Sequence, residues 1–526
     1  MNREFTFFIP GNIDLDAVLA ANPTTQLPIL KREKLAAVLH IVSDIASINK
    51  DISYNRGYIP INAEVLRSII GKEYHYYLLY LVEVGILDCN YSFSRRFNIS
   101  TGYKFKPAYQ TELKAVTINV SKPLHGHLVN SASDTPSSTT SNTSLTVVIE
   151  GTQYAVTTSD MTPTVTQELV KSKLPCKAKS LTKEEIKVFN FMMRSKYAHA
   201  YKWLDRMGLK IDHESAHSYN AKVYNVKRAN PDLRDREYST RYKRIIVKDP
   251  YIQYLAGHSS IENIRNGRVR QHFDPNICRF HTNLTNMKRE LRNFITWDSQ
   301  PLVGVDLSSS QPTLLTGLFD PLFWRGEKEF SISSLPLSIN PSFVRTSPLI
   351  TLCDFIHGKN GAVPEDVNRY ISLIEGGNFK DNFRDLVFKS TGRHYLGDSI
   401  KPVIFLTLYT SNRFIGQPEA EPKRAFRDVF PNVYKLTCLL KKGQSEALPK
   451  LLQRMESYLM FNKILPRIEY ERPDLPLFAI HDSLVTIRGN EEYVEQIMKQ
   501  EIHKAIGIQP HFKRECWHPN QLDHIL

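Results

Sequence analysis

The sequence has few cysteines and no long apolar run. Its six cysteines include no CxxC pair, so neither a disulfide scaffold nor a zinc ribbon is expected, and a reducing compartment fits best. No run of about 18 apolar residues occurs, so we expect no membrane-spanning helix and no membrane partner. The first residues, MNREFTFFIPGNIDLD, lack the basic and apolar segments of a secretory signal. We therefore expect an intracellular, cytoplasmic protein, and an origin in a phage, a plasmid or an organellar element stays open.

The overall composition is that of a globular protein with an excess of positive charge. Glycine and proline are scarce, with 23 and 29 residues in a chain of 526, which excludes collagen-like and low-complexity classes. At roughly 150 residues per domain, the length predicts three or four domains. The 68 lysines and arginines exceed the 54 acidic residues and give a net charge of +14. This excess favours a polyanionic partner, with nucleic acid before any other.

The N-terminal part reads as three helices followed by two strands. Residues 31–49 place apolar side chains at helical spacing, and the helices expected in INAEVLRSIIG and HYYLLYLVEVGIL end at Gly71 and Gly85. The strand-like pieces LDCNYSF and GYKFKPAY follow, separated by a tip that contains Arg95 and Arg96. This order resembles a winged helix, which would place a helix in a major groove and the two arginines on phosphates. A generic small α+β domain is an equally good interpretation.

Two further stretches stand out by composition before the C-terminal half. Ten of the fifteen residues 131–145 are serine or threonine, which predicts a flexible linker, and the strand-like LTVVIEGTQYAV that follows has no assigned role. Helical sequence begins at residue 181, with Thr182 as a candidate cap. Residues 222–248 hold nine lysines or arginines against three acidic residues, interleaved with tyrosines. They suit either a groove that binds a nucleic-acid backbone and stacks bases or a solvated helix face.

Three segments of the C-terminal half carry candidate catalytic residues. PLVGVDLSSSQPTLL delivers Asp306 at the end of an apolar strand, and LPLFAIHDSLVTIRG places Asp482 between two strand-like runs, as in a hairpin. Between them, GRHYLGDSIKPVIFLTLYTSN spaces Lys401, Phe405 and Tyr409 four residues apart on one helical face. Each segment alone is a weak signal, because aspartates are common in turns and at strand ends.

In this order the three segments resemble motifs A, B and C of the palm-type polymerases, which comprise the family A DNA polymerases and the single-subunit phage-type and mitochondrial-type RNA polymerases. The resemblance covers roughly residues 275–526. RFHTNLTNMKRELRNFI looks like the segment that contacts template and primer, which implies that Arg279, His281 and Arg292 bind nucleic acid, together with His481. ISLIEGGNFKDNFRDLVF looks like the finger helices that precede motif B.

The resemblance implies a role for each motif residue. Asp306 and Asp482 would bind two Mg²⁺ ions, with the Leu307 carbonyl as an extra ligand and Mn²⁺ as an alternative ion. Lys401 would be a catalytic residue that contacts the triphosphate, and Phe405 and Tyr409 would stack beneath the incoming nucleotide. The implied partners are a DNA template and primer and nucleoside triphosphates; protein partners are unknown.

The sequence departs from these families at several positions. Gly397 occupies the place of a motif B arginine, and Arg393 is the nearest substitute as a nucleotide-binding residue. Pro402 requires that the motif B helix begin late, with Asp398 or Ser399 as its cap. Gln311 replaces the family A glutamate that excludes the ribose 2′-OH, where the RNA polymerases have glycine. His481-Asp482-Ser483 is the RNA-polymerase version of motif C.

The predicted fold class is α+β, a right-hand polymerase whose antiparallel palm sheet carries helical fingers and thumb. We expect an extension over residues 1–30, a winged-helix domain over 31–110, a Ser/Thr-rich linker over 111–180, a helical thumb or template-binding region over 181–300, and the palm and fingers over 301–526. The preferred function is a DNA polymerase. The alternatives are a single-subunit-type RNA polymerase or primase, and a winged-helix replication initiator with a non-catalytic palm.

Overall fold

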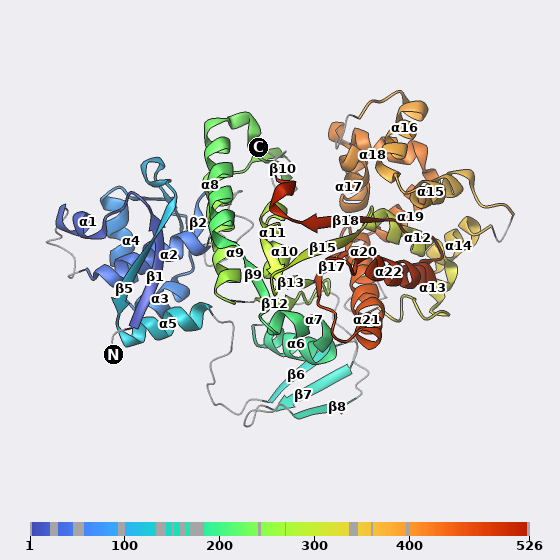
Figure 1. The fold of residues 1–526 in the computed structure, drawn as a ribbon. Coiled ribbons are helices and arrows are strands. Elements are labelled where there is room, and N and C mark those ends of the chain that lie inside the picture. The colour runs from blue at the N-terminus through green and yellow to red at the C-terminus, as the bar shows by residue number, and fades with distance from the viewer. Residues whose placement is uncertain are drawn as a thin grey trace.

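The structure is a computed structural model of the chain. It describes residues 3–21, 30–45, 57–92, 100–132, 144–149, 152–157, 164–168, 183–239, 244–268, 270–335, 346–358, 361–395 and 400–522. Figure 1 shows the N-terminal elements on one side, a sheet in the middle and a group of C-terminal helices on the other side. Within the described ranges, no helix is both long enough and apolar enough to cross a membrane.

The first strand of the N-terminal unit pairs with its last strand. It contains β1 (Arg3–Pro10), α1 (Leu15–Ala21), α2 (Arg32–Ile45), β2 (Ile59–Pro60), α3 (Ala63–Ile70), α4 (Tyr74–Glu83), β3 (Leu87–Cys89), β4 (Gly102–Phe105), β5 (Leu113–Val120) and α5 (Lys122–Ala132). β1 is antiparallel to β5 along its whole length, and both strands share one core with the helices between them. The pairing joins residues 3–10 to residues 113–120, on either side of the expected 31–110 range, and local sequence patterns do not reveal a strand partner so far along the chain.

The three predicted helices of this unit are confirmed as α2, α3 and α4. The apolar face of α2 is buried, Asn62 caps α3 by accepting from the Glu64 N–H, and Gly71 ends α3 with a positive φ of 95°. The predicted strand pieces form β3 and β4, in a three-stranded sheet of order β2-β4-β3. Arg95 and Arg96 lie outside the described residues, so the winged-helix resemblance stays a prediction.

Part of the expected linker over residues 111–180 is regular structure. Besides β5 and α5, it contains β6 (Ser144–Ile149), β7 (Thr152–Thr157) and β8 (Thr164–Glu168), which pair as a three-stranded antiparallel sheet. The strand-like patch is thus confirmed as a strand pair. Most of the Ser/Thr-rich stretch lies outside the described residues, and so does Thr182.

The N-terminal unit packs against two helices from the middle of the chain. This region contains α6 (Lys183–Lys196), α7 (Ala198–Asp205), β9 (Leu209–Ile211), α8 (His213–Ala229), β10 (Arg236–Ser239), β11 (Arg244–Val247) and α9 (Pro250–Arg265). Tyr224 from α8 and Tyr251 and Tyr254 from α9 belong to the core of the N-terminal unit. Tyr224 is therefore packed in the interior, which contradicts a base-stacking role for it, and Tyr242 lies outside the described residues.

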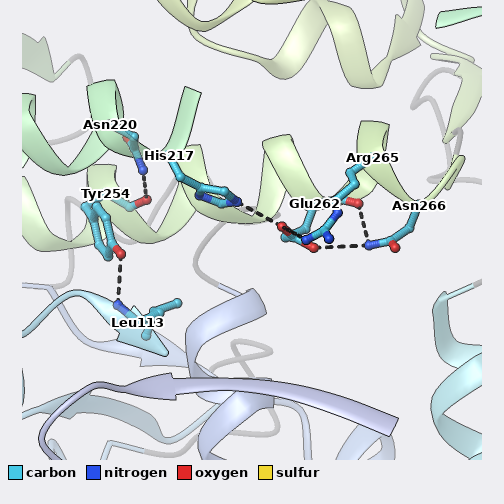
Figure 2. A network of polar contacts seen from close by, with 7 residues as sticks. All are labelled: Leu113, His217, Asn220, Tyr254, Glu262, Arg265 and Asn266. Atoms are coloured by element: carbon cyan, nitrogen blue, oxygen red, sulfur yellow. Dashed lines mark hydrogen bonds and ion pairs between the residues drawn. The ribbon is translucent and has the colours of Figure 1, made fainter. Parts of the chain in front are cut away.

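Polar contacts reinforce the same junction (Figure 2). The Leu113 N–H of β5 donates to the Tyr254 hydroxyl at 2.9 Å, and the Asn220 amide donates to the Tyr254 carbonyl at 2.9 Å. His217 on α8 lies 2.8 Å from the Glu262 carboxylate on α9. These contacts tie α8 to α9, and α9 to the N-terminal unit.

A six-stranded sheet occupies the centre of the molecule. β14 (Ile295–Trp297), β15 (Gln300–Leu307), β16 (Leu477–Ile480), β17 (Ser483–Ile487) and β18 (Phe512–Trp517) join β9 in the order β16-β17-β15-β14-β9, and β18 also pairs with β15. The predicted strand before Asp306 and the predicted hairpin around Asp482 are confirmed as β15 and β16–β17. The segment before β14 forms β12 (Gln271–Phe273), β13 (Phe280–Thr282), α10 (Asn283–Asn286) and α11 (Arg289–Arg292).

The remaining helices surround this sheet and share its core. They are α12 (Ser310–Thr316), α13 (Pro321–Arg325), α14 (Thr346–Ile356), α15 (Glu365–Glu375), α16 (Phe379–Thr391), α17 (Lys401–Tyr409), α18 (Glu421–Val429), α19 (Pro431–Leu440), α20 (Ala447–Tyr458), a π-helix (Leu459–Ile464), α21 (Leu465–Glu471) and α22 (Glu491–Ile506). The expected late start of the motif B helix is confirmed, because α17 begins at Lys401 with Pro402 in its first turn. The candidate caps Asp398 and Ser399 lie outside the described residues.

Candidate active site

Asp306 lies near the end of a buried strand with a neighbour on each side. β15 runs through the core, and Asp306 is opposite Ser483 of β17 and Lys513 of β18. Leu302, Val303, Val305 and Leu307 are buried around it. A carboxylate held this way is fixed in direction, because its backbone is paired on both edges.

Asp482 lies in the two-residue turn that joins β16 to β17. Ile480 pairs with Ser483, so only His481 and Asp482 form the turn, and His481 has a φ of 57°. Such tight hairpins require a positive φ at one central residue. The Leu307 N–H donates to the Asp482 carbonyl at 3.3 Å, which joins the turn to the end of β15. The structure therefore brings Asp306, Leu307 and Asp482 together.

Both turns beside the two aspartates contain a residue with left-handed backbone. Ser309, three residues after Asp306, has a φ of 52°, and His481 has a φ of 57°. Residues other than glycine rarely adopt this conformation, and they occur disproportionately at functional sites. The left-handed backbone at these two positions is not evident from sequence spacing.

The two carboxylates are electrostatically unfavourable when both are charged. Burial, together with the Asp482 and Glu515 carboxylates, raises the pKa of Asp306 to about 7, against the opposing effects of Arg289 and Lys380. Burial also raises the pKa of Asp482, against the opposing effects of Arg279 and Ser310. Among the described residues, neither aspartate forms an ion pair. A site of this kind favours a positively charged ligand.

The aspartates face a cleft of about 850 Å³. The sheet and the beginning of α16 both line this cleft. The cleft mixes carboxylates with a larger number of cations; its charged and hydroxyl-bearing residues are Arg289, Arg292, Asp306, Ser308, Ser309, Lys380, Asp381, Arg384, Asp482, Ser483, Lys513, Arg514 and Glu515. This composition fits a ligand that carries both a metal ion and several negative charges.

Lys380 and Arg384 are cleft residues that sequence reasoning missed. They are one turn apart near the start of α16. The charge of Lys380 acts to lower the pKa of Asp306. The i, i+4 spacing of two cations in FKDNFRDL was the available signal, but a solvated helix face has the same spacing.

Arg289 and Arg292 of α11 also line the cleft. The Arg289 Nε is 2.5 Å from the Glu515 carboxylate of β18. Burial lowers the pKa of Arg292, and its Nε has no hydrogen-bond partner among the described residues. Arg292, predicted to bind nucleic acid, therefore does line the cleft.

A second polar cluster consists of Glu456 of α20 and the two side chains that donate to it. Arg279 donates to both oxygens of the Glu456 carboxylate, at 2.8 and 2.9 Å, and the Gln311 amide donates to it at 2.9 Å. Burial raises the pKa of Glu456 to about 7 against the effect of Arg279. Sequence reasoning missed Glu456, because nothing in the pattern of α20 distinguishes it from other helical glutamates.

The predicted stacking residues lie together on α17. Phe405 and Tyr409 are 49% and 36% exposed, and their ring centroids are 5.7 Å apart. Burial raises the pKa of Tyr409, and Glu456 and Asp482 act in the same direction while Arg279 opposes them. Tyr409 therefore lies near both polar clusters. The Gln311 amide, five residues past Asp306, donates to Glu456.

Other predicted site residues are placed differently. Arg393 forms an ion pair with Glu421 at 2.7 Å and is not among the residues that line the cleft. The side chain of Lys401 lies outside the described part of the chain. His281 is 6.0 Å from His481 between ring centroids and 5.4 Å from His272, so the two predicted histidines are neighbours.

The donor set of the cleft fits Mg²⁺. Magnesium takes oxygen ligands, and proteins commonly supply one or two carboxylates while substrate phosphates and water complete the shell. Within the described chain no three histidine, cysteine or acidic side chains form a metal-binding group, and the pair Asp306 and Asp482 matches the one or two carboxylates that Mg²⁺ commonly takes from a protein. Their mutual repulsion is the feature that a divalent cation would relieve.

No protein-family model matches this chain, and no curated protein matches it either. Among solved structures, the chain is similar to the POL domain of Pol1 from M. smegmatis in complex with a DNA primer-template and dNTP. The identity is 13%, the match covers 61% of this chain and 70% of that chain, and the TM-score is 0.24. A likeness this weak supports no conclusion by itself, so the function must be inferred from the site.

Proposed function

We propose that this protein is a template-dependent nucleotidyltransferase, and that its preferred activity is DNA synthesis. The observation that carries the proposal is the pair Asp306 and Asp482, which are held at adjoining strand ends and face a cleft rich in cations. Two carboxylates on adjacent rigid elements are what metal-assisted phosphoryl transfer requires. The order of the three motifs in the sequence supports the same interpretation.

In the proposed reaction a primer 3′-oxygen attacks the α-phosphorus of a nucleoside triphosphate. A bond forms between that oxygen and the phosphorus, the bond to the pyrophosphate oxygen breaks, and the 3′-hydroxyl proton is released. Asp306 and Asp482, with the Leu307 carbonyl, would hold two Mg²⁺ ions, which stabilise the negative charge that develops on the entering and leaving oxygens. The buried strand β15 would keep Asp306 in place, and the β16–β17 hairpin turn would keep Asp482 in place, without reorganisation.

The cations of α16 and α17 would bind the triphosphate. Lys380 and Arg384 face the cleft from α16, and Lys401 would approach from the first turn of α17. Phe405 and Tyr409, partly exposed on α17, would form the floor beneath the base and sugar. Arg393 is a weaker candidate than Lys380, because Glu421 already neutralises its charge.

The sugar preference would depend on Gln311 and its partner Glu456. Gln311 is a filled volume five residues past Asp306, and its amide is fixed by Glu456. A side chain held in that place would disfavour a ribose 2′-OH, which supports dNTPs over rNTPs. The RNA polymerase or primase alternative, favoured by His481-Asp482-Ser483 in the hairpin turn, stays open until both substrates are compared.

Extension of a labelled primer–template tests the proposal. The purified chain is incubated with Mg²⁺ and either the four dNTPs or the four rNTPs, beside an unprimed template and a sample with EDTA. We expect Mg²⁺-dependent extension, faster with dNTPs. Faster extension with rNTPs would favour the RNA polymerase, products from the unprimed template a primase, and DNA binding without any synthesis the replication initiator.

A further inference from the structure

The C-terminal end of α17 leaves backbone carbonyls without helical partners. The last four carbonyls of any helix lack an N–H from a following turn. In α17, the Thr410 N–H and hydroxyl both donate to the Leu406 carbonyl. The carbonyls of Thr407 and Thr410 accept from side chains instead, and the Ser411 carbonyl, just past the helix, accepts from a side chain as well as from the Phe414 N–H.

Two buried lysines supply these donors. The Lys441 Nζ donates to the carbonyls of Thr407 and Thr410. The Lys423 Nζ donates to the Ser411 carbonyl at 2.8 Å and to the Thr410 hydroxyl at 3.1 Å. Lys423 is 0% exposed and Lys441 is 3% exposed, which is rare for lysine unless the charge has a partner.

The partners of this pair are carbonyl oxygens. Neither lysine forms an ion pair with a carboxylate in the described part of the chain, and each acts on the pKa of the other. The negative end of the α17 dipole therefore offsets the two charges. Because Lys423 comes from α18 and Lys441 directly follows α19, the contacts join α17 to both helices.

The contacts of Lys423 and Lys441 with the end of α17 are called here the anchor. The location of the anchor matters because α17 carries the two aromatic residues Phe405 and Tyr409. Tyr409 is the last residue of the helix, and Phe405 is one turn earlier. Both rings are partly exposed and would form the floor of the nucleotide site. A shift of the last turn would move both rings, whereas the aspartates on β15 and in the hairpin turn would stay in place.

We propose that Lys423 and Lys441 are positioning residues that fix the C-terminal end of α17 and thereby hold Phe405 and Tyr409 in place for the incoming nucleotide. The proposal rests on the proposed function for the identity of the ligand. The anchoring itself does not depend on it and can be measured without any synthesis.

The lysines also give the anchor a pH dependence. Burial and Lys423 lower the pKa of Lys441 to about 7, and Cys438 of α19, which neighbours Tyr434, opposes them. The unfolded chain would keep this proton up to about pH 10.5. Since the unfolded state binds more protons between about pH 7 and 10, the contribution of Lys441 makes the folded state more stable as the pH rises through this window.

The test compares Lys441→Met, Lys423→Met and a matched control, Lys328→Met. The Lys328 Nζ also donates to a carbonyl at a helix end, that of Ala505 in α22, at 3.2 Å, but α22 carries no residue of the proposed nucleotide site. Amide hydrogen exchange is measured over residues 400–415 in each full-length variant, and steady-state nucleotide incorporation is measured beside it. Thr410→Val, which removes a hydroxyl acceptor without deleting a lysine, serves if a lysine variant does not fold.

We expect faster exchange at residues 405–411 in both lysine variants and, more weakly, in Thr410→Val, but not in Lys328→Met. We also expect KM for the nucleotide to rise about tenfold with kcat within about threefold, which is the signature of lost binding. The rise of stability between pH 7 and 10 should shrink in Lys441→Met. Unchanged exchange at residues 405–411, or an equal rise of KM in Lys328→Met, would overturn the proposal. If the wild type proves inactive, the exchange and pH measurements still decide whether the anchor exists.

Discussion

At the scale of single residues, buried carboxylates dominate the chemistry of the cleft. Asp306 and Glu456 each have a pKa raised to about 7 by burial. Asp306 was predictable from sequence, because a short apolar strand leads directly to it. Glu456 was not predictable, because its partners Gln311 and Arg279 lie 145 and 177 residues away along the chain. Contacts over such distances depend on how the helices pack, which no local pattern records.

Asp306→Asn should stabilise the protein without metal and abolish its stabilisation by metal. The native state holds the Asp306 proton up to about pH 7, and the unfolded state releases it near pH 4, so the wild type loses stability as pH rises between these values. At pH 8 in EDTA we expect the variant to be more stable by about 1–3 kcal/mol, with little difference at pH 4. Thermal unfolding with and without Mg²⁺ measures both effects. A variant that gains as much from Mg²⁺ as the wild type would remove Asp306 from the metal site.

Gln311→Gly should weaken the preference for deoxyribose. Removing the side chain opens space for a 2′-OH, so we expect the ratio of kcat/KM for rNTP to that for dNTP to rise by about tenfold. Single-nucleotide incorporation with matched substrates measures this ratio. Glu456→Gln, which keeps the volume but removes the charge, should change the ratio less. If the ratio is unchanged in Gln311→Gly, Gln311 does not contact the sugar.

At the scale of elements, most of the secondary structure near the site followed from the sequence. The strand before Asp306, the hairpin around Asp482 and the late start of α17 were all predicted, because each has a strong local signal in alternation, turn chemistry or proline. The pairing of β1 with β5 and the packing of α8 on α9 were not predicted. Gly257 of α9 illustrates the reason, because the need for glycine there is set by the neighbouring helix α8. An added Cβ would lie 2.3 Å from the Asn220 side chain of α8.

Gly257→Ala should therefore destabilise the protein, although alanine is the better helix former. The added methyl must displace Asn220, whose amide is bonded to the Tyr254 carbonyl, and we expect a loss of about 1–3 kcal/mol. Gly126→Ala is the matched control, because Gly126 is also within a helix and its Cβ would meet nothing within 4 Å. That change should be neutral or stabilising by up to about 1 kcal/mol. Equal effects of the two changes in thermal or denaturant unfolding would contradict the close approach of α8 and α9.

At the scale of the whole molecule, the N-terminal unit and the rest of the chain share a core. Tyr224, Tyr251 and Tyr254 pack into the N-terminal unit, so deleting residues 31–110 would remove most of the core against which they pack. A binding test of this unit must therefore alter charge without removing structure. The sequence predicted a small N-terminal domain, but its limits depend on β5 and α9, which are distant in sequence.

Changing Arg95 and Arg96 together to alanine tests the proposed duplex contact of the N-terminal unit. Loss of two phosphate contacts should lower the slope of log K against log salt by about 2, and should weaken duplex binding about equally across sequences. Fluorescence anisotropy with a labelled duplex at several salt concentrations measures the slope. An unchanged slope would show that the two arginines do not contact phosphate and would remove the main support for a winged-helix role.

The most direct test of the central claim is single-turnover primer extension with Mg²⁺ by the wild type, Asp306→Asn and Asp482→Asn. Asp381→Asn is the control, because Asp381 lines the same cleft from α16 and pairs with Arg384. Each aspartate variant should lose at least about a thousandfold in rate while binding the primer–template as tightly as the wild type, and Asp381→Asn should retain synthesis within about tenfold. Synthesis within a few-fold of the wild type in either aspartate variant would contradict the assignment of Asp306 and Asp482 as the catalytic pair.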